Sequence, residues 1–484
     1  MNNKNFLKNF TIIGSGTFIN MFLGVITTPI ITRLVDPTEY GKLSIFTMYA
    51  SIAVMILCLG LDQALVRFYY EHKGNREKRA LLFKCVNMPV IITICVSFIV
   101  ITLSKIGIIQ FEFDTFTLIL LCFYTFSEII FRFSHLLIRL NFNSKLFALL
   151  NVLRKAIYVI CAIPLILLIN KNYSTLLIIS TIIASVICLI ISICAQANYW
   201  NIFKNRPSLC HVKRKELINY GYPYIISMGI TTLFQAIDKI SLNMYCSYSE
   251  VGIYSSTMTL VHIFSLVQTT FNSLWQPMAV EHYTNNPKDT SFYKRGNQAI
   301  TVVMFFIGIT LILIKDIFAI LLGEQYREAA YILPFLIFNP IMYTISETTV
   351  CGLIFMKKSS MQIISGAGAC IVNIIGNTLL VPALASQGAA ISTGISYIVF
   401  FALRTILSNK YFYIDFKLKK FSLLTIIVVF YAFYNTFISF NIGSIIGYIV
   451  CISVLMILYK STVIWGVGYI RDVLNSIIRK NNKV

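Results

Sequence analysis

Charged side chains are scarce in this chain. Asp, Glu, Lys and Arg make up 12% of its 484 residues, whereas hydrophobic residues make up 57%. A soluble domain of this length could not cover so large an apolar surface with so few charges. The composition therefore excludes a soluble globular protein and predicts an integral membrane protein.

Acidic residues are the scarcer charge type: 19 Asp and Glu stand against 40 Lys and Arg, a net charge of +21. Such an excess would fit a nucleic-acid-binding protein if the basic residues formed one patch. They lie instead in short clusters between apolar segments, a pattern typical of membrane topology. We therefore expect membrane lipid, and no nucleic acid, among the partners.

Motifs for metal or redox chemistry are missing as well. The 12 cysteines form no CxxC pair, and most, such as Cys58 and Cys122, lie inside apolar runs as small apolar side chains. The N-terminal apolar run, 10–31, is too long for the core of a secretory signal, so we assign it to the first transmembrane helix. We expect no cofactor, no metal ion and no catalytic residue.

Apolar stretches of about 20 residues, the length that crosses a bilayer, recur fourteen times. They lie near residues 10–32, 41–70, 80–104, 115–139, 146–170, 174–200, 217–246, 250–280, 296–321, 329–356, 360–382, 387–408, 421–440 and 443–460. This pattern predicts an all-α membrane protein with about 14 transmembrane helices.

Basic residues are distributed unequally between the two sides of the membrane. We count 28 on the side that holds both termini, Arg404 among them, and six on the opposite side, Lys315 among them. The positive-inside rule then places both termini in the cytoplasm. The outer loops are too short for a catalytic domain, so the protein's work is expected within the membrane.

A polar break at residues 201–216 divides the chain. Six predicted spans precede it in 1–200, six follow in 217–408, and 409–484 holds an accessory helix pair and a cytoplasmic tail. A short repeat supports this division, because Glu-Tyr-Gly at 39–41 and Glu-Val-Gly at 250–252 open corresponding spans 211 residues apart. Six spans in each half give both halves the same orientation, as in transporters that rock two bundles around a central cavity.

Two ionisable side chains close the second predicted span. An ionised group costs about 2.5–3.5 kcal/mol at the centre of a bilayer. Asp62 and Arg67 lie about 140° apart around a helix, so they do not form a simple pair. Arg67 lies near the cytoplasmic end, where it can snorkel toward Glu71. Asp62 is a turn deeper and requires a partner from another helix, water or a proton.

The fourth span carries a polar stripe. Tyr124, Glu128, Arg132, His135 and Arg139 share a face about 60–80° wide on a helical wheel, and we expect that face to avoid lipid. The structural alternative is an ion pair between Glu128 and Arg132 within the helix, with Arg139 anchoring the helix end.

The fifth span adds Asn151, Arg154, Lys155 and Tyr158 on one side. Arg154 and Lys155 are adjacent cations without an acid in their own helix, which predicts a polar cavity. The second half contributes mainly neutral polar groups, together with the acids Asp238 and Glu347. Asp238 either pairs with Lys239 at the interface or belongs to the cavity.

Cations suit phosphate, while amides and aromatic faces suit sugar hydroxyls and rings. We therefore predict a wet central cavity for a substrate with an anionic head and a carbohydrate body. Its cationic group comprises Arg67, Arg132, Arg154 and Lys155. Its sugar-facing group comprises Tyr124, Asn151, Tyr158, Gln235, Gln268, Asn272, Trp275, Gln362 and Asn373.

Four segments carry a family resemblance: TRLVDPTEYGKLS after the first span, GLDQALVRFYYE closing the second, AIDKISLNMYCSYSEVGIYS between the seventh and eighth, and WQPM in the eighth. Together with the helix count, they make the chain resemble the Wzx-type polysaccharide and O-antigen repeat-unit flippases. These belong to the multidrug/oligosaccharidyl-lipid/polysaccharide exporter superfamily.

The resemblance implies a flippase of the bacterial cytoplasmic membrane that serves capsule or O-antigen biosynthesis. It would move an undecaprenyl-pyrophosphate-linked oligosaccharide from the cytoplasmic to the outer leaflet by alternating access, beside other membrane proteins of polysaccharide assembly. Arg132, Arg154 and Lys155 would then meet the pyrophosphate. Candidates for a proton or sodium site are the intramembrane acids Asp62, Glu128, Asp238 and Glu347.

Three other functions compete with this one. Lipid II flippases of the same superfamily typically place arginines in the first span, and here that span has none between Lys8 and Arg33. A multidrug exporter of organic cations is the nearest alternative, but a cavity with Arg154 and Lys155 unpaired would repel cations. A membrane glycosyl polymerase or ligase would need a large outer loop with catalytic groups, and the outer segments are short.

Overall fold

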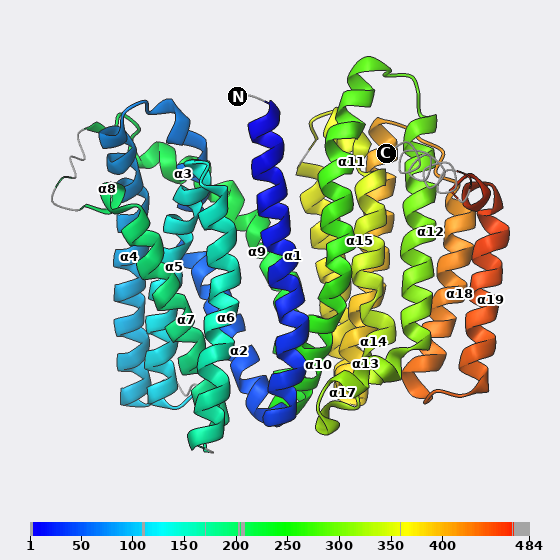
Figure 1. The fold of residues 1–484 in the computed structure, drawn as a ribbon, viewed down its shortest axis with the longest axis horizontal. Helices are drawn as coiled ribbons and strands as arrows, with labels where there is room; N and C mark the ends of the chain where they lie inside the picture. Colours follow the sequence, from blue (N-terminus) through cyan, green and yellow to red (C-terminus); the bar gives the residue numbers. More distant parts are fainter. Residues whose placement is uncertain are drawn as a thin grey trace, which may run out of the picture. The chain divides into compact units, whose positions relative to one another are not determined.

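The computed structural model describes residues 3–108, 112–169, 171–201, 204, 209–358, 360–466 and 468. Within these ranges every regular element is a helix, which confirms the all-α prediction (Figure 1). The chain divides into two compact units. Unit 1 comprises Met1–Ile240 and Ser247–Gly252, and unit 2 comprises Ser241–Cys246 and Ile253–Val484.

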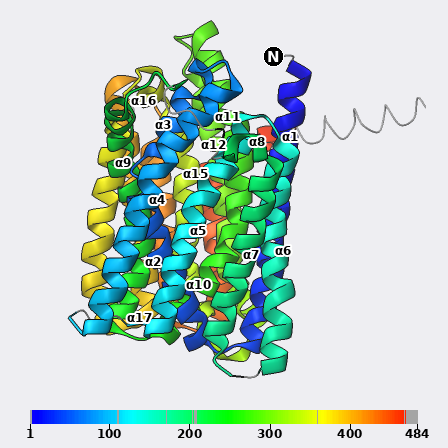
Figure 2. The same cartoon turned by 90° about the vertical axis from the view of Figure 1, so that its left-hand side faces the viewer.

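Unit 1 is a bundle of long helices joined by short turns. Its elements are α1 (Asn3–Leu34), α2 (Pro37–Leu57), α3 (Leu61–Phe68), the 3-10 turn η1 (Tyr69–Glu71), α4 (Asn75–Ile106), α5 (Thr115–Leu140), α6 (Ser144–Ile169), α7 (Tyr173–Ala195), α8 (Ala197–Trp200) and most of α9 (Arg214–Tyr245). α4 packs against α5, α5 against α7, α7 against α6 and α6 against α1, an arrangement that Figure 2 shows from the side of unit 1.

Unit 2 contains more broken helices. Its elements are most of α10 (Tyr248–Val261), η4 (His262–Phe264), α11 (Ser265–Asn285), α12 (Ser291–Leu313), α13 (Lys315–Leu321), η5 (Glu324–Tyr326), α14 (Ala329–Leu336), α15 (Phe338–Thr349), α16 (Cys351–Phe355), α17 (Ser360–Tyr411), α18 (Leu418–Phe437) and α19 (Ile442–Leu458). α15 and α14 pack on α17, and the pair α18–α19 packs on α14 and α12. α17 is two helices joined at Ala385, whose φ of 47° interrupts the helical backbone.

Ten helices in the described ranges are long and apolar enough to cross a membrane, or up to twelve if each of two bent pairs is one span. Each of the fourteen predicted apolar stretches falls on a helix or on a helix broken by a turn. The number fourteen itself is not confirmed. Apolar length therefore locates the membrane segments, whereas breaks within them decide how many uninterrupted spans result.

The predicted second span, 41–70, is interrupted between α2 and α3. Leu59 and Gly60 adopt left-handed conformations there, with φ of 54° and 65°. A close approach also requires glycine at position 60, because a Cβ would lie 2.3 Å from the carbonyl oxygen of Gly221 in α9. The break places Asp62 in the first turn of α3, where a helix N-terminus favours a carboxylate.

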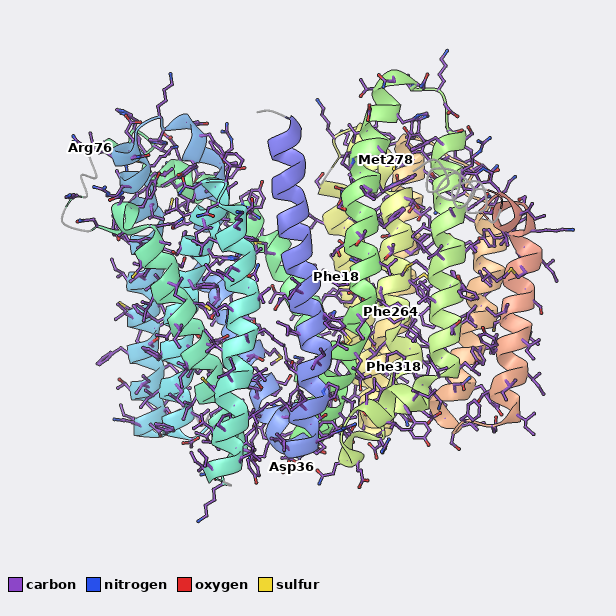
Figure 3. The ribbon with its side chains drawn as sticks, in the orientation of Figure 1. Phe18, Asp36, Arg76, Phe264, Met278 and Phe318 are labelled. Atoms are coloured by element: carbon purple, nitrogen blue, oxygen red, sulfur yellow. The ribbon has the colours of Figure 1, made fainter. Side chains whose placement is uncertain are left out.

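Large apolar side chains remain exposed along the membrane helices. Phe98 in α4 is 72% exposed, Leu168 in α6 is 82% exposed and Phe430 in α18 is 71% exposed. In Figure 3 the side chains project from the helices along their length, and the labelled Phe18 of α1 is 54% exposed. Such a surface is stable in lipid rather than in water, and the chain is a multi-pass membrane protein.

Two cations of α4 hold the segment that follows α7. Arg79 donates hydrogen bonds from Nε to the carbonyl oxygen of Asn198 at 2.7 Å and from Nη1 to that of Lys204 at 3.0 Å. Lys84 donates from Nζ to the carbonyl oxygen of Val212 at 2.7 Å. The described part of the polar break is therefore docked on unit 1, and the functional division of the chain at this break stays a prediction.

Candidate functional site

Asp62 is paired across helices. Its Oδ2 accepts hydrogen bonds from Arg132 of α5, from Nε at 2.9 Å and Nη2 at 2.7 Å, and from Gln63 Nε2 at 3.0 Å. The Asp62 side chain is 3% exposed, whereas that of Arg132 is 34% exposed. The sequence left another helix, water or a proton open as the partner of Asp62. In the structure the partner is Arg132 of another helix. The guanidinium is the member of the pair that stays accessible.

Glu128 lies one turn before Arg132 on α5, yet it pairs with α6. Arg154 donates from Nη1 to Glu128 Oε2 at 3.2 Å and from Nη2 to the second carboxylate oxygen, so the pair is bidentate. Arg154 Nη2 also donates to the Tyr124 hydroxyl at 2.8 Å, and the Ser185 hydroxyl of α7 donates to the carboxylate.

These contacts correct two expectations from the sequence. Glu128 and Arg132 form no ion pair with each other in the described structure, because each is engaged by a different neighbouring helix. Arg154 is also not an unpaired cation, because α5 supplies the acid that α6 lacks. The cross-links join α3, α5, α6 and α7 of unit 1.

Lys155 is the surplus cation of this group. Among the described residues its ammonium has no ion pair or hydrogen bond. A Cβ on Gly24 of α1 would lie 3.8 Å from Lys155 Nζ, an ordinary van der Waals distance, so the ammonium lies at the contact of α1 and α6. We call five residues the charged cluster: Asp62, Glu128, Arg132, Arg154 and Lys155. With three cations and two carboxylates, its formal net charge is +1.

Arg67 does not belong to the charged cluster. It forms an ion pair with Glu71 at i+4, and the two side chains are 52% and 45% exposed. The expected contact with Glu71 is present, and the assignment of Arg67 to a substrate-binding cationic group stays a prediction. An exposed pair of this kind contributes little to stability.

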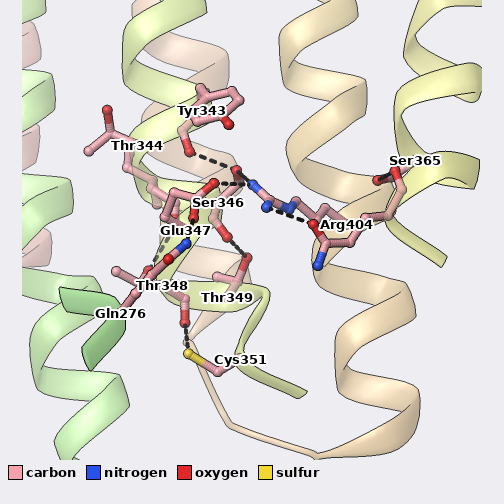
Figure 4. A network of polar contacts seen from close by, with 12 residues as sticks. Gln276, Tyr343, Thr344, Ser346, Glu347, Thr348, Thr349, Cys351, Ser365 and Arg404 are labelled. Carbon is pink, nitrogen blue, oxygen red and sulfur yellow. Dashed lines mark hydrogen bonds and ion pairs between the residues drawn. The ribbon is translucent and has the colours of Figure 1, made fainter. Parts of the chain in front are cut away.

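In unit 2 the acid Glu347 of α15 lies in a buried polar network (Figure 4). Arg404 of α17 donates from Nη1 to Glu347 Oε1 at 2.7 Å and to Ser346 Oγ at 2.8 Å, and from Nη2 to Gln362 Oε1 at 3.4 Å. Gln276 of α11 donates from Nε2 to Glu347 Oε2 at 3.1 Å. The side chains of Arg404 and Glu347 are 7% and 3% exposed. Counting Arg404 among the charges outside the spans was wrong, because α17 carries it to a buried acid.

Lys315, which the topology count assigned to the outer side, is a second buried charge. Its side chain is fully buried, and Nζ donates to the carbonyl oxygens of Asn435 at 2.6 Å and Ile438 at 2.8 Å. These carbonyls end α18 and lack partners within the helix, so a cation there satisfies them. Lys315 therefore ties α13 to the accessory helix pair, and its assignment to the outer side stays a prediction.

Two of the expected sugar-facing residues are buried. The Trp275 ring is 5% exposed and lies stacked between Phe271 and Phe292, with ring centroids 5.5 Å and 5.4 Å away. Asn373 is fully buried and donates from Nδ2 to Ser392 Oγ at 3.4 Å. Helix packing covers both side chains in this structure, and their assignment to a sugar stays a prediction.

The other expected residues differ in accessibility. Tyr124 is buried beneath Arg154, and Asp238 is buried as well. The half-buried side chains are Asn151, Tyr158, Gln268, Asn272 and Gln362, and Gln235 is exposed. Their assignment to a sugar stays a prediction.

Arg404 and Ser185 belong to these networks but were not predicted from the sequence. Arg404 had a usable signal, because it lies between apolar residues in the run FFALRTIL and a loop cation would not. Ser185 had none, since a serine in an apolar helix normally bonds its own backbone. Which hydroxyl faces a carboxylate depends on helix packing alone.

Comparison with known proteins gives a family and a fold. The family model described as polysaccharide biosynthesis protein matches residues 6–282. The uncharacterized membrane protein MJ1068 of Methanocaldococcus jannaschii is 22% identical over 433 residues, which cover 83% of this chain and 84% of that protein.

Two solved structures share the fold. The lipid II flippase MurJ in an inward closed conformation has a TM-score of 0.69 at 15% identity and covers 96% of this chain and 100% of that one. A multidrug resistance MATE family transporter of the MOP superfamily, inward-facing, has a TM-score of 0.61 at 11% identity and covers 82% of this chain and 94% of that one. At these identities the likeness establishes the fold alone.

Proposed function

The chain belongs to the polysaccharide biosynthesis protein family, and on that premise we propose that it is a flippase for an undecaprenyl-pyrophosphate-linked oligosaccharide. It moves the repeat unit from the cytoplasmic to the outer leaflet of a bacterial cytoplasmic membrane, with both termini in the cytoplasm. The pyrophosphate is the group that the protein must carry through the apolar region, because the lipid tail can stay in the bilayer.

The observation that carries this proposal is the net positive charge of the charged cluster. Ionisable residues inside membrane helices are energetically unfavourable, and they mark substrate or ion pathways. The two carboxylates of the cluster each have an arginine, and Lys155 remains without an anion among the described residues. An anionic head would supply the missing partner.

The cations of the charged cluster contact phosphate in different ways. Lys155 is a compact point charge on a flexible stem and makes the first contact with a phosphate. Arg154 presents a planar fork that matches phosphate oxygens, and its side chain is 29% exposed, whereas Arg132, 34% exposed, adds positive charge beside the two. Asn151 and Tyr158 are half-buried on the same helix as Arg154 and Lys155, which supports assigning them to the first sugar.

The direct test is transport by the purified protein in liposomes. Undecaprenyl-pyrophosphate oligosaccharide is placed in both leaflets, and an impermeant enzyme that cleaves the sugar reports the fraction reaching the outer leaflet over time. We expect protein-dependent movement of the glycolipid. The variant R154A/K155A is expected to lose at least tenfold in rate, because both phosphate contacts are removed. A matched control, K171A, changes an exposed lysine at the turn between α6 and α7 and is expected to transport normally. Full activity of R154A/K155A at equal protein level refutes the proposal.

A multidrug exporter of organic cations is the second candidate, because the chain shares the MATE transporter fold. The same liposomes loaded with an organic cation dye distinguish the two. Movement of the dye without movement of the glycolipid transfers the assignment to multidrug export. The +1 charge of the cluster argues against that outcome.

A further inference from the structure

The four paired charges of the cluster have a second possible arrangement. Glu128 and Arg132 are four residues apart on α5 with the acid nearer the N-terminus, the favourable order for an ion pair along a helix. In the structure they do not use it, since Glu128 holds Arg154 and Arg132 holds Asp62. Turning these two side chains of α5 toward each other would release Arg154 and Asp62.

Once released from Glu128, Arg154 can bind an anionic substrate. Arg154 and Lys155 are neighbours on α6, and a phosphate bound by both must displace the Glu128 carboxylate from Arg154. The displaced carboxylate then needs another cation in an apolar region. Arg132, one turn along the same helix, is within its reach.

The release of Asp62 has a consequence as well. Groups facing this carboxylate are Arg132 from α5, Gln63 from its own helix, and the thiols of Cys58 from the end of α2 and Cys85 from α4. The described structure records no second cation paired with it. When Arg132 turns away, the carboxylate loses the one cation paired with it and faces thiols and apolar side chains, where the ionised form is unstable.

Resting on the flippase function proposed above, we infer that Asp62 is the coupling acid: anion binding at Arg154 and Lys155 shifts Glu128 to Arg132 and makes Asp62 take up one proton. Charge balance supports one proton. The cluster starts at +1, and a dianionic pyrophosphate diester would leave it at −1. One proton bound to the Asp62 carboxylate returns the net charge of the cluster to zero. A neutral cluster has the lowest free energy within a bilayer.

The first experiment measures proton uptake on binding. Undecaprenyl-pyrophosphate-linked N-acetylglucosamine in detergent is titrated into the purified full chain in weakly buffered solution with a pH dye. We expect about one proton taken up per ligand, and therefore a dissociation constant that rises about tenfold per unit of pH. The variant D62N is expected to bind the ligand with no proton uptake and no such pH dependence. The control E71Q, in an exposed pair, is expected to behave like the unaltered protein.

The second experiment tests the exchange itself, that is, the move of Glu128 from Arg154 to Arg132. It needs no ligand, so its result does not depend on the proposed function. The variant R154Q removes the partner of Glu128, so the exchange predicts that Glu128 moves to Arg132 and Asp62 binds a proton at neutral pH. The infrared spectrum of R154Q should then show the carbonyl stretch of a protonated carboxylic acid. That band should shift in protein made with carbon-13-labelled aspartate and be absent from R154Q/D62N.

The outcomes differ for the two claims. A band that does not shift with labelled aspartate means that Glu128 keeps the proton, and the exchange is overturned. Ligand binding by the unaltered protein without proton uptake overturns it too. If the unaltered protein fails to bind the glycolipid, the proposed function fails, while the infrared result still decides the exchange.

Discussion

The buried pair of Glu347 and Arg404 offers the sharpest test of the energetics. Replacing Glu347 by Leu keeps a similar volume and leaves the guanidinium with Ser346 and Gln362. Because the Arg404 side chain is 7% exposed, water cannot replace the lost carboxylate. Removing one partner of a buried ion pair destabilises a protein by about 3–5 kcal/mol.

The contacts give a similar magnitude. Glu347 accepts one hydrogen bond from Arg404 at 2.7 Å and one from Gln276 at 3.1 Å. Hydrogen bonds to charged groups contribute roughly 1.5–3 kcal/mol each. Glu347→Gln keeps one acceptor oxygen for the arginine and replaces the other by an NH2 group, which the Gln276 amide accepts by turning over, so its loss should be smaller, about 1–3 kcal/mol. The double variant Glu347→Leu/Arg404→Met removes both charges and should recover most of the loss.

The assay is equilibrium unfolding of the purified protein in mixed micelles of increasing denaturing detergent, followed by tryptophan fluorescence. The free energy of unfolding is compared among the variants and the control Glu71→Gln, for which an exposed pair predicts a change below about 1 kcal/mol. The reasoning is refuted if Glu347→Leu is as stable as this control. It is equally refuted if the double variant loses the sum of the two single losses.

Three further substitutions test single contacts. Lys315→Met removes two charge-assisted bonds to the end of α18, so we expect a loss of about 3 kcal/mol in unfolding free energy and faster proteolysis of α18–α19; unchanged proteolysis would contradict the tie. Gly60→Ala places a Cβ 2.3 Å from the Gly221 carbonyl oxygen, and we expect little folded protein by size-exclusion chromatography, whereas Gly466→Ala, in open space, should be neutral. Lys84→Met frees the docked segment, so trypsin should cut near Arg214 several-fold faster than in the unaltered protein.

Much of the fold could be predicted from local properties of the sequence. Apolar length marks every membrane helix, because the bilayer demands a minimum run of apolar side chains whatever the packing. That Asp62 needs a partner follows in the same way from the cost of an isolated buried charge, whereas the choice of Arg132 over water or a proton required the structure. A break inside an apolar run, as at Leu59 and Gly60, does not change the hydropathy of the run. Apolar length therefore cannot predict it.

The pairing of the charges could not be predicted. Glu128 and Arg132 satisfy the spacing rule for a pair within one helix, and only the approach of α3 and α6 to α5 offers each a different partner. Likewise, Arg404 and Lys315 read as flanking charges by position, and only the packing of α15 and α18 shows that both are buried.

The sequence by itself determined that this chain is a multi-pass helical membrane protein with cations inside its membrane helices, because hydrophobic length and the price of burying charge act on each segment separately. Tertiary structure alone decided which acid each cation meets and that Lys155 is the one left over in the charged cluster. Those choices depend on distances of a few ångströms between side chains far apart in the sequence, where electrostatic energy changes steeply.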